Sequence, residues 1–373
     1  MTTPSPEADQ QQPDLLLLAR AHDAAVLALE LAAARALSGP LRRQLAALAR
    51  TVLTQWPART GAAATPVDAA ARARIVDQMR AVAAQADAVR IEAEMIRAAN
   101  RAALLGSTHA EQQVALQRFG PPSPFVRIAQ EAAPAQPAGA ATVEPGRPVR
   151  AVAAAAGDTA AGHLQDAVKA LAAAETPAQA QAAVAVAQRA PEALDVATAW
   201  AVNRAANEAI RAHAARLGAE TMWVAERDAC VVCLALSGHL ADPNAGEGFD
   251  EEATFGKPGS APPVWPPGRP LIAPPRHPRC RCHLVVWLGS APGQPDLPST
   301  LRHEARRSIL RGFSRPSESH RIRVAAAGRL LDTGAADMPK SVRAYAMHAV
   351  ATGRFPTRDV PRWPSSQPRR AAP

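Results

Sequence analysis

Residues 228–233 read Asp-Ala-Cys-Val-Val-Cys and residues 277–282 read His-Pro-Arg-Cys-Arg-Cys, and these two stretches hold all four cysteines of the chain. In a Cys-x-x-Cys pair, a tight turn brings two thiolates toward one ion. A second close pair can complete the tetrahedral shell of four ligands that structural zinc prefers. The two stretches therefore predict a structural zinc site. Its expected ligands are Cys230, Cys233, Cys280 and Cys282.

The second cysteine pair is less regular than the first, because one residue rather than two separates its members. A mixed shell in which His277 or His283 replaces one sulfur fits the same sequence. Two other states of the cysteines also fit, namely two disulfides in an exported protein, or reduced and buried thiols. Residues 1–13 are polar and acidic and do not resemble a secretory signal, which favours reduced cysteines over disulfides.

Two short strands are expected on either side of the cysteine pairs. Residues 221–225 precede the first pair, and residues 283–288, which read His-Leu-Val-Val-Trp-Leu, follow the second. Between them, residues 243–278 contain ten prolines, which predicts an irregular surface loop. If the strands pair, all four sulfurs lie near one end of a small sheet. Zinc would then close the loop, since zinc binding contributes roughly 10–16 kcal/mol in small peptides and offsets the entropy of closure.

The composition of the whole chain indicates helices rather than one dense core. Of 373 residues, 48% are hydrophobic, but much of this fraction is alanine and only 3% of the residues are aromatic. Alanine favours helices and buries little area per residue. The expected fold is mainly α with a small α+β cysteine module, in an extended multi-helix chain with Pro-rich linkers. No run of eighteen apolar residues is present, so no membrane span is expected.

The N-terminal third predicts long helices. One helix is expected over 13–37, with a Gly-Pro stop signal at 39–40, and a second over 41–56. A longer helix is expected over 66–105, with Thr65 as its N-cap. Apolar residues step along this third helix by four and three, a heptad-like seam that needs a partner helix in this chain or in a neighbouring subunit. The seam consists of Ile75, Met79, Val82, Ala86, Val89, Ala93 and Ile96.

Residues 121–157 are rich in Pro, Ala and Gly and predict a linker. Helices are expected to resume over 159–174, 177–189 and 191–217, the last closed by Gly218 as a left-handed C-cap. The expected domains are an N-terminal helical domain (1–120), the linker (121–157), a core that carries the paired-cysteine module (158–296), and a basic helical C-terminal region with a tail (297–373).

The net charge of +9 is concentrated at the C-terminal end. Residues 297–373 contain fifteen Lys or Arg against five Asp or Glu, a net +10, which leaves the rest of the chain near neutral. Helices are expected over 301–313, 318–333 and 339–353, and their basic faces predict contacts with the phosphates of double-stranded DNA. A solvated basic face in a protein from a GC-biased genome accounts for the same residues without such a partner. The candidate nucleic-acid-binding residues are Arg302, Arg306, Arg307, Arg311, Arg321 and Arg323.

The sequence around the cysteines resembles a known family. Residues 223–238 place an aromatic residue and an Asp ahead of Cys-x-x-Cys and a Ser-Gly after it, and residues 274–282 form a Pro-rich segment that ends in His-Pro-Arg-Cys-Arg-Cys. This pattern is similar to the core of phage minor head proteins, the Mu F-like head morphogenesis family. The resemblance extends upstream to a helix that carries Asn203 and Asn207, and it covers about a quarter of the chain, residues 192–288.

The resemblance implies a structural role and not an enzymatic one. It implies a minor capsid protein of a tailed phage or prophage that acts in head morphogenesis near the portal. The implied partners are the portal protein, capsid or scaffolding proteins, and packaged double-stranded DNA. The implied location is the inside of the phage head, and the host cytoplasm during assembly.

Two other classes of function compete with this interpretation. A cellular zinc-ribbon-like nucleic-acid-binding protein would share both the metal site and the basic end. A zinc-dependent enzyme is less favoured, because no His-x-Glu precedes the first cysteine pair as it does in zinc deaminases. No His-Glu-x-x-His, phosphate-binding Gly loop or Gly-x-Ser-x-Gly is present either. Glu226, Asp228 and His239 lie near the cysteines in the sequence and are the side chains available for acid–base chemistry.

Overall fold

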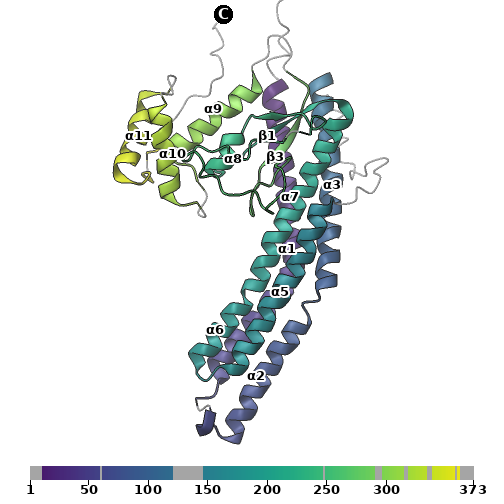
Figure 1. Cartoon of the computed structure of the whole chain (residues 1–373), viewed down its shortest axis with the longest axis vertical. Coiled ribbons are helices and arrows are strands. Elements are labelled where there is room, and N and C mark those ends of the chain that lie inside the picture. Colours follow the sequence, from purple (N-terminus) through teal and green to yellow (C-terminus); the bar gives the residue numbers. More distant parts are fainter. Residues whose placement is uncertain are drawn as a thin grey trace, which may run out of the picture. The chain divides into compact units, whose positions relative to one another are not determined.

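A computed structural model describes residues 11–58, 61–120, 146–246, 248–289, 296–314, 318–333, 338–357 and 359–361. The fold is mainly helical with a small three-stranded sheet (Figure 1), and a cysteine cluster accompanies the sheet, so the predicted fold class is confirmed. Residue contacts divide the chain into two compact units, neither of which is one continuous segment. We call the described residues of 11–23, 106–120 and 207–361 the cysteine unit, and those of 24–105 and 146–206 the helical unit.

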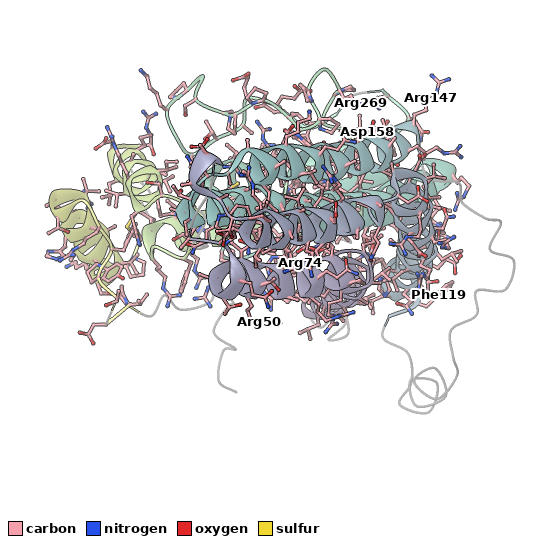
Figure 2. All side chains as sticks on the ribbon, turned by 90° about the horizontal axis from the view of Figure 1, so that it is seen from below. Arg50, Arg74, Phe119, Arg147, Asp158 and Arg269 are labelled. Carbon is pink, nitrogen blue, oxygen red and sulfur yellow. The ribbon has the colours of Figure 1, made fainter. Side chains whose placement is uncertain are left out.

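The helical unit is built from long helices, some of which continue into the cysteine unit. The segments concerned are α1 (Gln11–Gln55), the short 3-10 helix η1 (Gly61–Ala63), α2 (Pro66–Ala84), α3 (Ala88–Phe119), α5 (Arg147–Ala173), α6 (Pro177–Ala187) and α7 (Arg189–Leu217). Within this unit α5 packs against both α2 and α6. Arg50, Arg74 and Arg147 are exposed on its helices (Figure 2), so charge covers the outside while alanine and aliphatic residues fill the inside.

α1 is one continuous helix, and the predicted stop at 39–40 is wrong. Proline in a helix interior removes a hydrogen bond and costs about 3 kcal/mol, yet Pro40 lies inside α1. Packing around this point offsets the loss. Leu41 is buried, and the buried Ser38 donates a hydrogen bond to Asp195 of α7 (2.6 Å) while it accepts one from Arg42 (3.0 Å). Tertiary contacts therefore override the local stop signal.

The predicted helix over 66–105 is divided into α2 and α3. Its start is confirmed, since Thr65 is the N-cap of α2 and forms a capping box with Asp68. The division follows Ala84, where Asp87 accepts hydrogen bonds from the amides of Val89 and Arg90 and begins a new helix.

The break between α2 and α3 also shifts the predicted heptad-like seam. Ile75, Met79 and Val82 are buried as predicted, but Val89 is 74% exposed. In α3 the buried face passes instead through Ile91 and other residues, because the new start resets the helical phase. These further residues are Met95, Ala98, Ala99, Ala102 and Ala103. α5 supplies a partner for α2, within this chain.

α5 begins at Arg147, inside the predicted linker of 121–157. Pro148 occupies the first turn, where a missing amide proton costs nothing, and the alanines that follow favour helix. Residues 121–145 of that linker lie outside the described residues, as do residues 1–10 and the end of the C-terminal tail from 362. The predicted helices over 177–189 and 191–217 correspond to α6 and α7, and Gly218 adopts the expected left-handed conformation (φ 62°).

The sheet of the cysteine unit has the strand order β2-β1-β3 and is antiparallel throughout. The two predicted strands are β1 (Glu220–Val224) and β3 (His283–Trp287), which pair with Thr221 opposite Val286. β2 (Leu240–Ala241) is too short to be recognised in the sequence. Between β2 and β3, the described residues form no helix or strand, as the prolines predicted.

The two faces of the sheet pack against separate apolar cores. Trp223, Leu284 and Val286 face one core, which also contains three of the four cysteines. Met222, Val224, Val285 and Trp287 face the other, together with Leu15 of α1 and Leu301. The alternation follows from the period of two along a strand. Successive residues of β3 therefore face opposite sides of the sheet.

Further helices complete the cysteine unit. They are α8 (Val231–Leu236), α9 (Leu297–Leu310), α10 (His320–Asp332) and α11 (Lys340–Thr352). α8 packs on α9, and α9, α10 and α11 pack on one another. The three helices predicted after residue 300 thus exist within a few residues of the expected bounds. Among all helices that the structure describes, none combines the length and apolar character that crossing a bilayer requires.

The turn between α8 and β2 needs a glycine at position 238. Gly238 has a φ of 76°, and its amide donates to the carbonyl of Trp223 (2.8 Å). A Cβ atom there would lie 2.1 Å from the carbonyl oxygen of Pro298. The backbones of α9 and of this turn can therefore approach each other so closely only because residue 238 is glycine.

Two glutamine side chains of α3 satisfy the free edge of β3. Gln113 accepts a hydrogen bond from the amide of Val286 (2.9 Å), and Gln117 accepts one from the amide of Leu288 (3.1 Å). Gln117 also donates to the carbonyl of Val286 (2.8 Å). An open edge would otherwise present unpaired backbone groups.

Replacing Gln113 with leucine is expected to lower the free energy of unfolding by about 1–3 kcal/mol, because the buried amide of Val286 loses its acceptor. Chemical denaturation of the full-length protein measures this difference. The matched control is Gln112→Leu at the adjacent exposed position, which should change stability by less than about 0.5 kcal/mol. Equal effects of the two substitutions would contradict the proposed role of Gln113.

Candidate metal centre

The first cysteine pair lies where the chain turns from β1 into α8. Cys230 is the N-cap of α8, and Cys233 lies in its first turn, so one turn of helix brings the two side chains together. Glu318 accepts a hydrogen bond from the amide of Val231 (2.9 Å), which fixes the start of α8. A side chain from a distant part of the chain therefore stabilises the start of this short helix.

The second pair follows a tight turn that leads into β3. The amide of Cys280 donates to the carbonyl of His277 (3.0 Å), and Arg279 between them has a φ of 64°. Arg281 forms an ion pair with Asp228 at 3.2 Å, which ties this turn to the loop ahead of the first pair. The antiparallel pairing of β1 and β3 thus brings the two cysteine pairs to one end of the sheet, as the sequence predicted.

The cysteine sulfurs and the ring of His277 converge on one small region. The Nε2 atom of His277 lies 3.1 Å from the sulfur of Cys230 and 3.3 Å from that of Cys233. The sulfurs of Cys233 and Cys280 are 3.7 Å apart. Two zinc-bound sulfurs in a tetrahedral shell lie about 3.8 Å apart, given a zinc–sulfur distance of about 2.3 Å. The spacing of Cys233 and Cys280 therefore fits a shared metal ion.

The ligand atoms form two overlapping groups that could each hold a metal ion. One group is Cys230, Cys233 and His277, the other is Cys233, Cys280 and Cys282, and the atoms within each lie within 4.8 Å of one another. Cys233 belongs to both groups. All four predicted cysteines are therefore at the site, and His277 is a fifth candidate for a four-coordinate shell.

His283 is not part of this cluster, so the mixed shell that includes His283 is wrong. Its ligand atoms group with Asp23 and Glu226 instead. The reason is the strand period, because His283 faces the opposite side of β3 from Leu284, which packs into the core that contains the cysteines. No disulfide links the four cysteines, all of which are free thiols in the structure.

The charges within the cluster favour a bound cation. Burial alone would lower the pKa of His277, but the neighbouring Cys230 and Cys280 thiolates raise it to about 9. The hydrogen bond from Cys233 and the neighbouring imidazole of His277 hold the pKa of Cys230 well below its usual value. A divalent cation would supply the same positive charge, and its binding would release protons from these groups.

Comparisons with protein-family models, with curated proteins and with solved structures find no significant match to this chain. Any function assigned to this site therefore rests on the geometry of the described residues. The cysteine cluster supports metal binding directly, because its ligand types and spacing fit a metal ion.

The six arginines predicted to bind nucleic acid do not form one exposed face. Arg323 is fully buried, and its guanidinium donates to Glu318 (2.7 Å) and to the carbonyl of Ala229 (2.7 Å). Its assignment as a phosphate contact is wrong, because it supports the backbone next to Cys230. Arg302 donates to the carbonyl of Gly238 (3.0 Å) but remains exposed. Arg306 and Arg321 are exposed.

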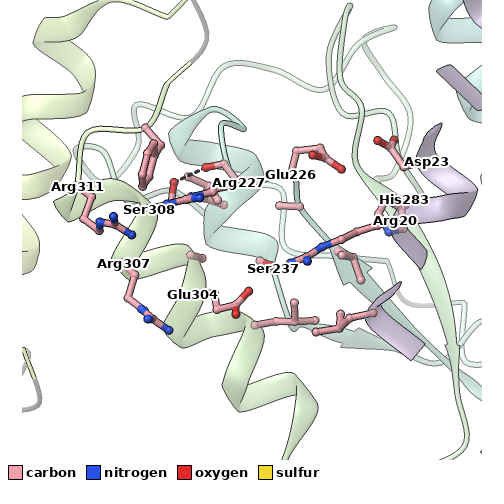
Figure 3. A pocket seen from close by; sticks show the side chains of 17 residues that line it. Arg20, Asp23, Glu226, Arg227, Ser237, His283, Glu304, Arg307, Ser308 and Arg311 are labelled. Atoms are coloured by element: carbon pink, nitrogen blue, oxygen red, sulfur yellow. Dashed lines mark hydrogen bonds between the residues drawn. The ribbon is translucent and has the colours of Figure 1, made fainter. Parts of the chain in front are cut away.

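Arg307 and Arg311 line a cavity of about 630 Å³ that the sequence did not predict (Figure 3). The guanidinium of Arg227 lies 3.7 Å from the centre of the Phe313 ring, and that of Arg311 lies 4.9 Å from it. The other charged residues that line the cavity are Arg20, Asp23, Glu226 and Glu304. Asp23 and Arg20 come from α1, whose sequence gives no sign that they meet residues two hundred positions away.

His283 lines this cavity, and its ring lies near that of His22, which in turn contacts the half-buried His109. The ring centres of His22 and His109 are 3.7 Å apart, and those of His22 and His283 are 6.4 Å apart. Burial lowers the pKa of both His109 and His283 to about 4, so these two rings are neutral at pH 7. The sequence indicates Glu226 only as a side chain close to the cysteines, and His283 only as an alternative zinc ligand.

Proposed function

We propose that this protein is a structural minor head protein of a tailed phage or prophage, and that its cysteine cluster holds a structural zinc ion. In this role it acts in head assembly near the portal. Its partners would be the portal protein, capsid or scaffolding proteins, and packaged double-stranded DNA. It would assemble in the host cytoplasm and end inside the virion.

The observation that carries the proposal is the convergence of the two cysteine pairs across a long irregular loop. This loop-closing arrangement occurs in the segment that resembles the Mu F-like head morphogenesis family. Cysteine and histidine ligands suit zinc. Cys233, Cys280 and Cys282 are at most 4% exposed, which supports a closed structural site rather than an open catalytic one.

Copurification tests the assembly role. Full-length protein, expressed with the portal and scaffolding proteins of the same phage or prophage, is expected to copurify with portal rings or procapsids. Omission of the portal protein is the control. If all head proteins are coexpressed and the protein still purifies alone, the head assignment is contradicted. That result would favour a cellular zinc-ribbon-like nucleic-acid-binding protein.

The DNA contact leads to a separate prediction. The full-length protein is expected to bind duplex DNA with little sequence preference, because exposed arginines neutralise phosphates and release counterions. Replacing both Arg306 and Arg321 with glutamine should reduce the slope of log affinity against log salt concentration by about 2. Fluorescence anisotropy over a salt series measures the slope.

The control for the DNA experiment is an exposed arginine of the helical unit. Arg74→Gln on α2 is expected to leave the salt dependence of binding unchanged. If the double variant binds DNA with the same salt slope as the wild-type protein, the phosphate contacts do not lie on α9 and α10.

A further inference from the structure

Asp23, Glu226 and His283 meet on one wall of the cavity of about 630 Å³. Their carboxylate and imidazole ligand atoms all lie within 4.8 Å of one another. Asp23 comes from α1, Glu226 from the loop after β1, and His283 is the first residue of β3. Figure 3 shows the two carboxylates on the same side of the cavity as the His283 ring.

The His283 ring supplies a second, independent observation. The residue is only 3% exposed, and neither of its ring nitrogens has a hydrogen-bond partner among the described residues. A buried polar group without a partner costs about 1–3 kcal/mol, and such a group commonly indicates a water molecule or an ion. The backbone amide of the next residue, Leu284, has a partner, since it donates to the side-chain oxygen of Asn207 (2.6 Å).

The site lies on the opposite side of β3 from the cysteine cluster. His283 is the first residue of β3, and side chains of successive strand residues face opposite sides. Leu284 accordingly packs into the core that holds the cysteines, whereas Val285 packs into the other core. His283 shares the Val285 side, where Leu301 of α9 lines both that core and the cavity.

We propose that Asp23, Glu226 and His283 form a second metal site, which binds a divalent first-row transition ion such as Mn²⁺. Two carboxylates and one imidazole suit this class of ion, whereas thiolates select zinc. The cation would lie between two carboxylates and would give the buried imidazole of His283 a partner. Three protein ligands leave coordination positions for water on the cavity side.

Titration of the full-length protein with Mn²⁺ tests this proposal, with the signal of free Mn²⁺ followed by electron paramagnetic resonance. We expect the wild-type chain to bind one Mn²⁺ with a coupling to a nitrogen nucleus, observed by pulsed measurements, that identifies the histidine ligand. Asp23→Asn and Glu226→Gln preserve side-chain size, and each should weaken binding at least about 10-fold. The matched control is Glu304→Gln, which removes a carboxylate from the same cavity outside the triad and should leave Mn²⁺ affinity unchanged.

Four results would overturn the proposal. They are the absence of Mn²⁺ binding to the wild-type chain, equal weakening by Glu304→Gln, retention of full affinity in both ligand variants, and bound Mn²⁺ without a nitrogen coupling. The nitrogen coupling is measured on the wild-type protein and therefore tests for a histidine ligand even if a ligand variant misfolds. Its absence from bound Mn²⁺ would also exclude His283 as a ligand.

Discussion

Cys233→Ser is expected to abolish metal binding by the cysteine cluster and to destabilise the cysteine unit by more than about 4 kcal/mol, the range typical of a lost structural metal. Cys233 has the largest expected effect because its sulfur belongs to both ligand groups. Without the ion, the long loop between α8 and β3 regains its chain entropy. Hydrogen exchange measured by mass spectrometry should show lost protection in β1 and β3.

The same experiment contains its own controls. Protection of α5 and α6 in the helical unit should be unchanged by Cys233→Ser, because neither helix belongs to the cysteine unit. A metal chelator should reproduce the effect in the wild-type protein and have no further effect on the variant. If the variant responds to the chelator as strongly as the wild-type protein does, Cys233 is not a ligand.

Arg323→Met is expected to lower the free energy of unfolding by about 3–5 kcal/mol. The substitution leaves the carboxylate of Glu318 and the carbonyl of Ala229 without their buried donor, and an unpaired buried charge has a cost of this size. Urea denaturation of the full-length protein provides the measurement. The effect should reach the cysteine cluster, since Glu318 also binds the amide of Val231 at the start of α8.

The matched control for Arg323 is its neighbour Arg321, which is exposed on the same helix. Arg321→Met should change stability by less than about 0.5 kcal/mol. Combining Arg323→Met with Glu318→Gln should restore part of the loss, because the partner charge is then removed. A small effect of Arg323→Met, equal to that of Arg321→Met, would show that the buried pair does not stabilise the unit.

The sequence predicted the cysteine module well because its signals are local. Cys230 and Cys233 are close in the chain, and the apolar strands β1 and β3 flank the two pairs directly. A short run of β-branched and aromatic residues identifies such strands without any knowledge of the rest. The capping box at Thr65 and the left-handed Gly218 were predictable for the same reason.

The errors arose where distant residues decide the outcome. Pro40 remains helical because contacts that include Asp195 of α7 hold that part of α1. Arg323 is buried because Glu318 and the carbonyl of Ala229 meet it there, although a charged residue on a helix is usually exposed. The distant partners, Asp195 for α1 and the carbonyl of Ala229 for Arg323, cannot be recognised from the sequences of the helices that they contact.

The second candidate site was missed for a related reason. Asp23 lies on a long helix near the start of the chain, and nothing in its surroundings there marks it as a ligand. Only the packing of α1 beside β3 within the cysteine unit brings it to Glu226 and His283. The alternation of side chains along β3 then separates His283 from the cysteines. This separation could have been predicted from the sequence, because the strand itself was predicted.

Zinc release on thiol modification tests the central assignment most directly. Full-length protein is titrated with an organomercurial reagent that reacts with thiolates, while a colorimetric indicator measures the zinc set free. The account predicts one zinc ion released per chain in proportion to modification of the cysteines, and no such release from Cys233→Ser. Modification of all four cysteines of the wild-type protein without release of any zinc would contradict it.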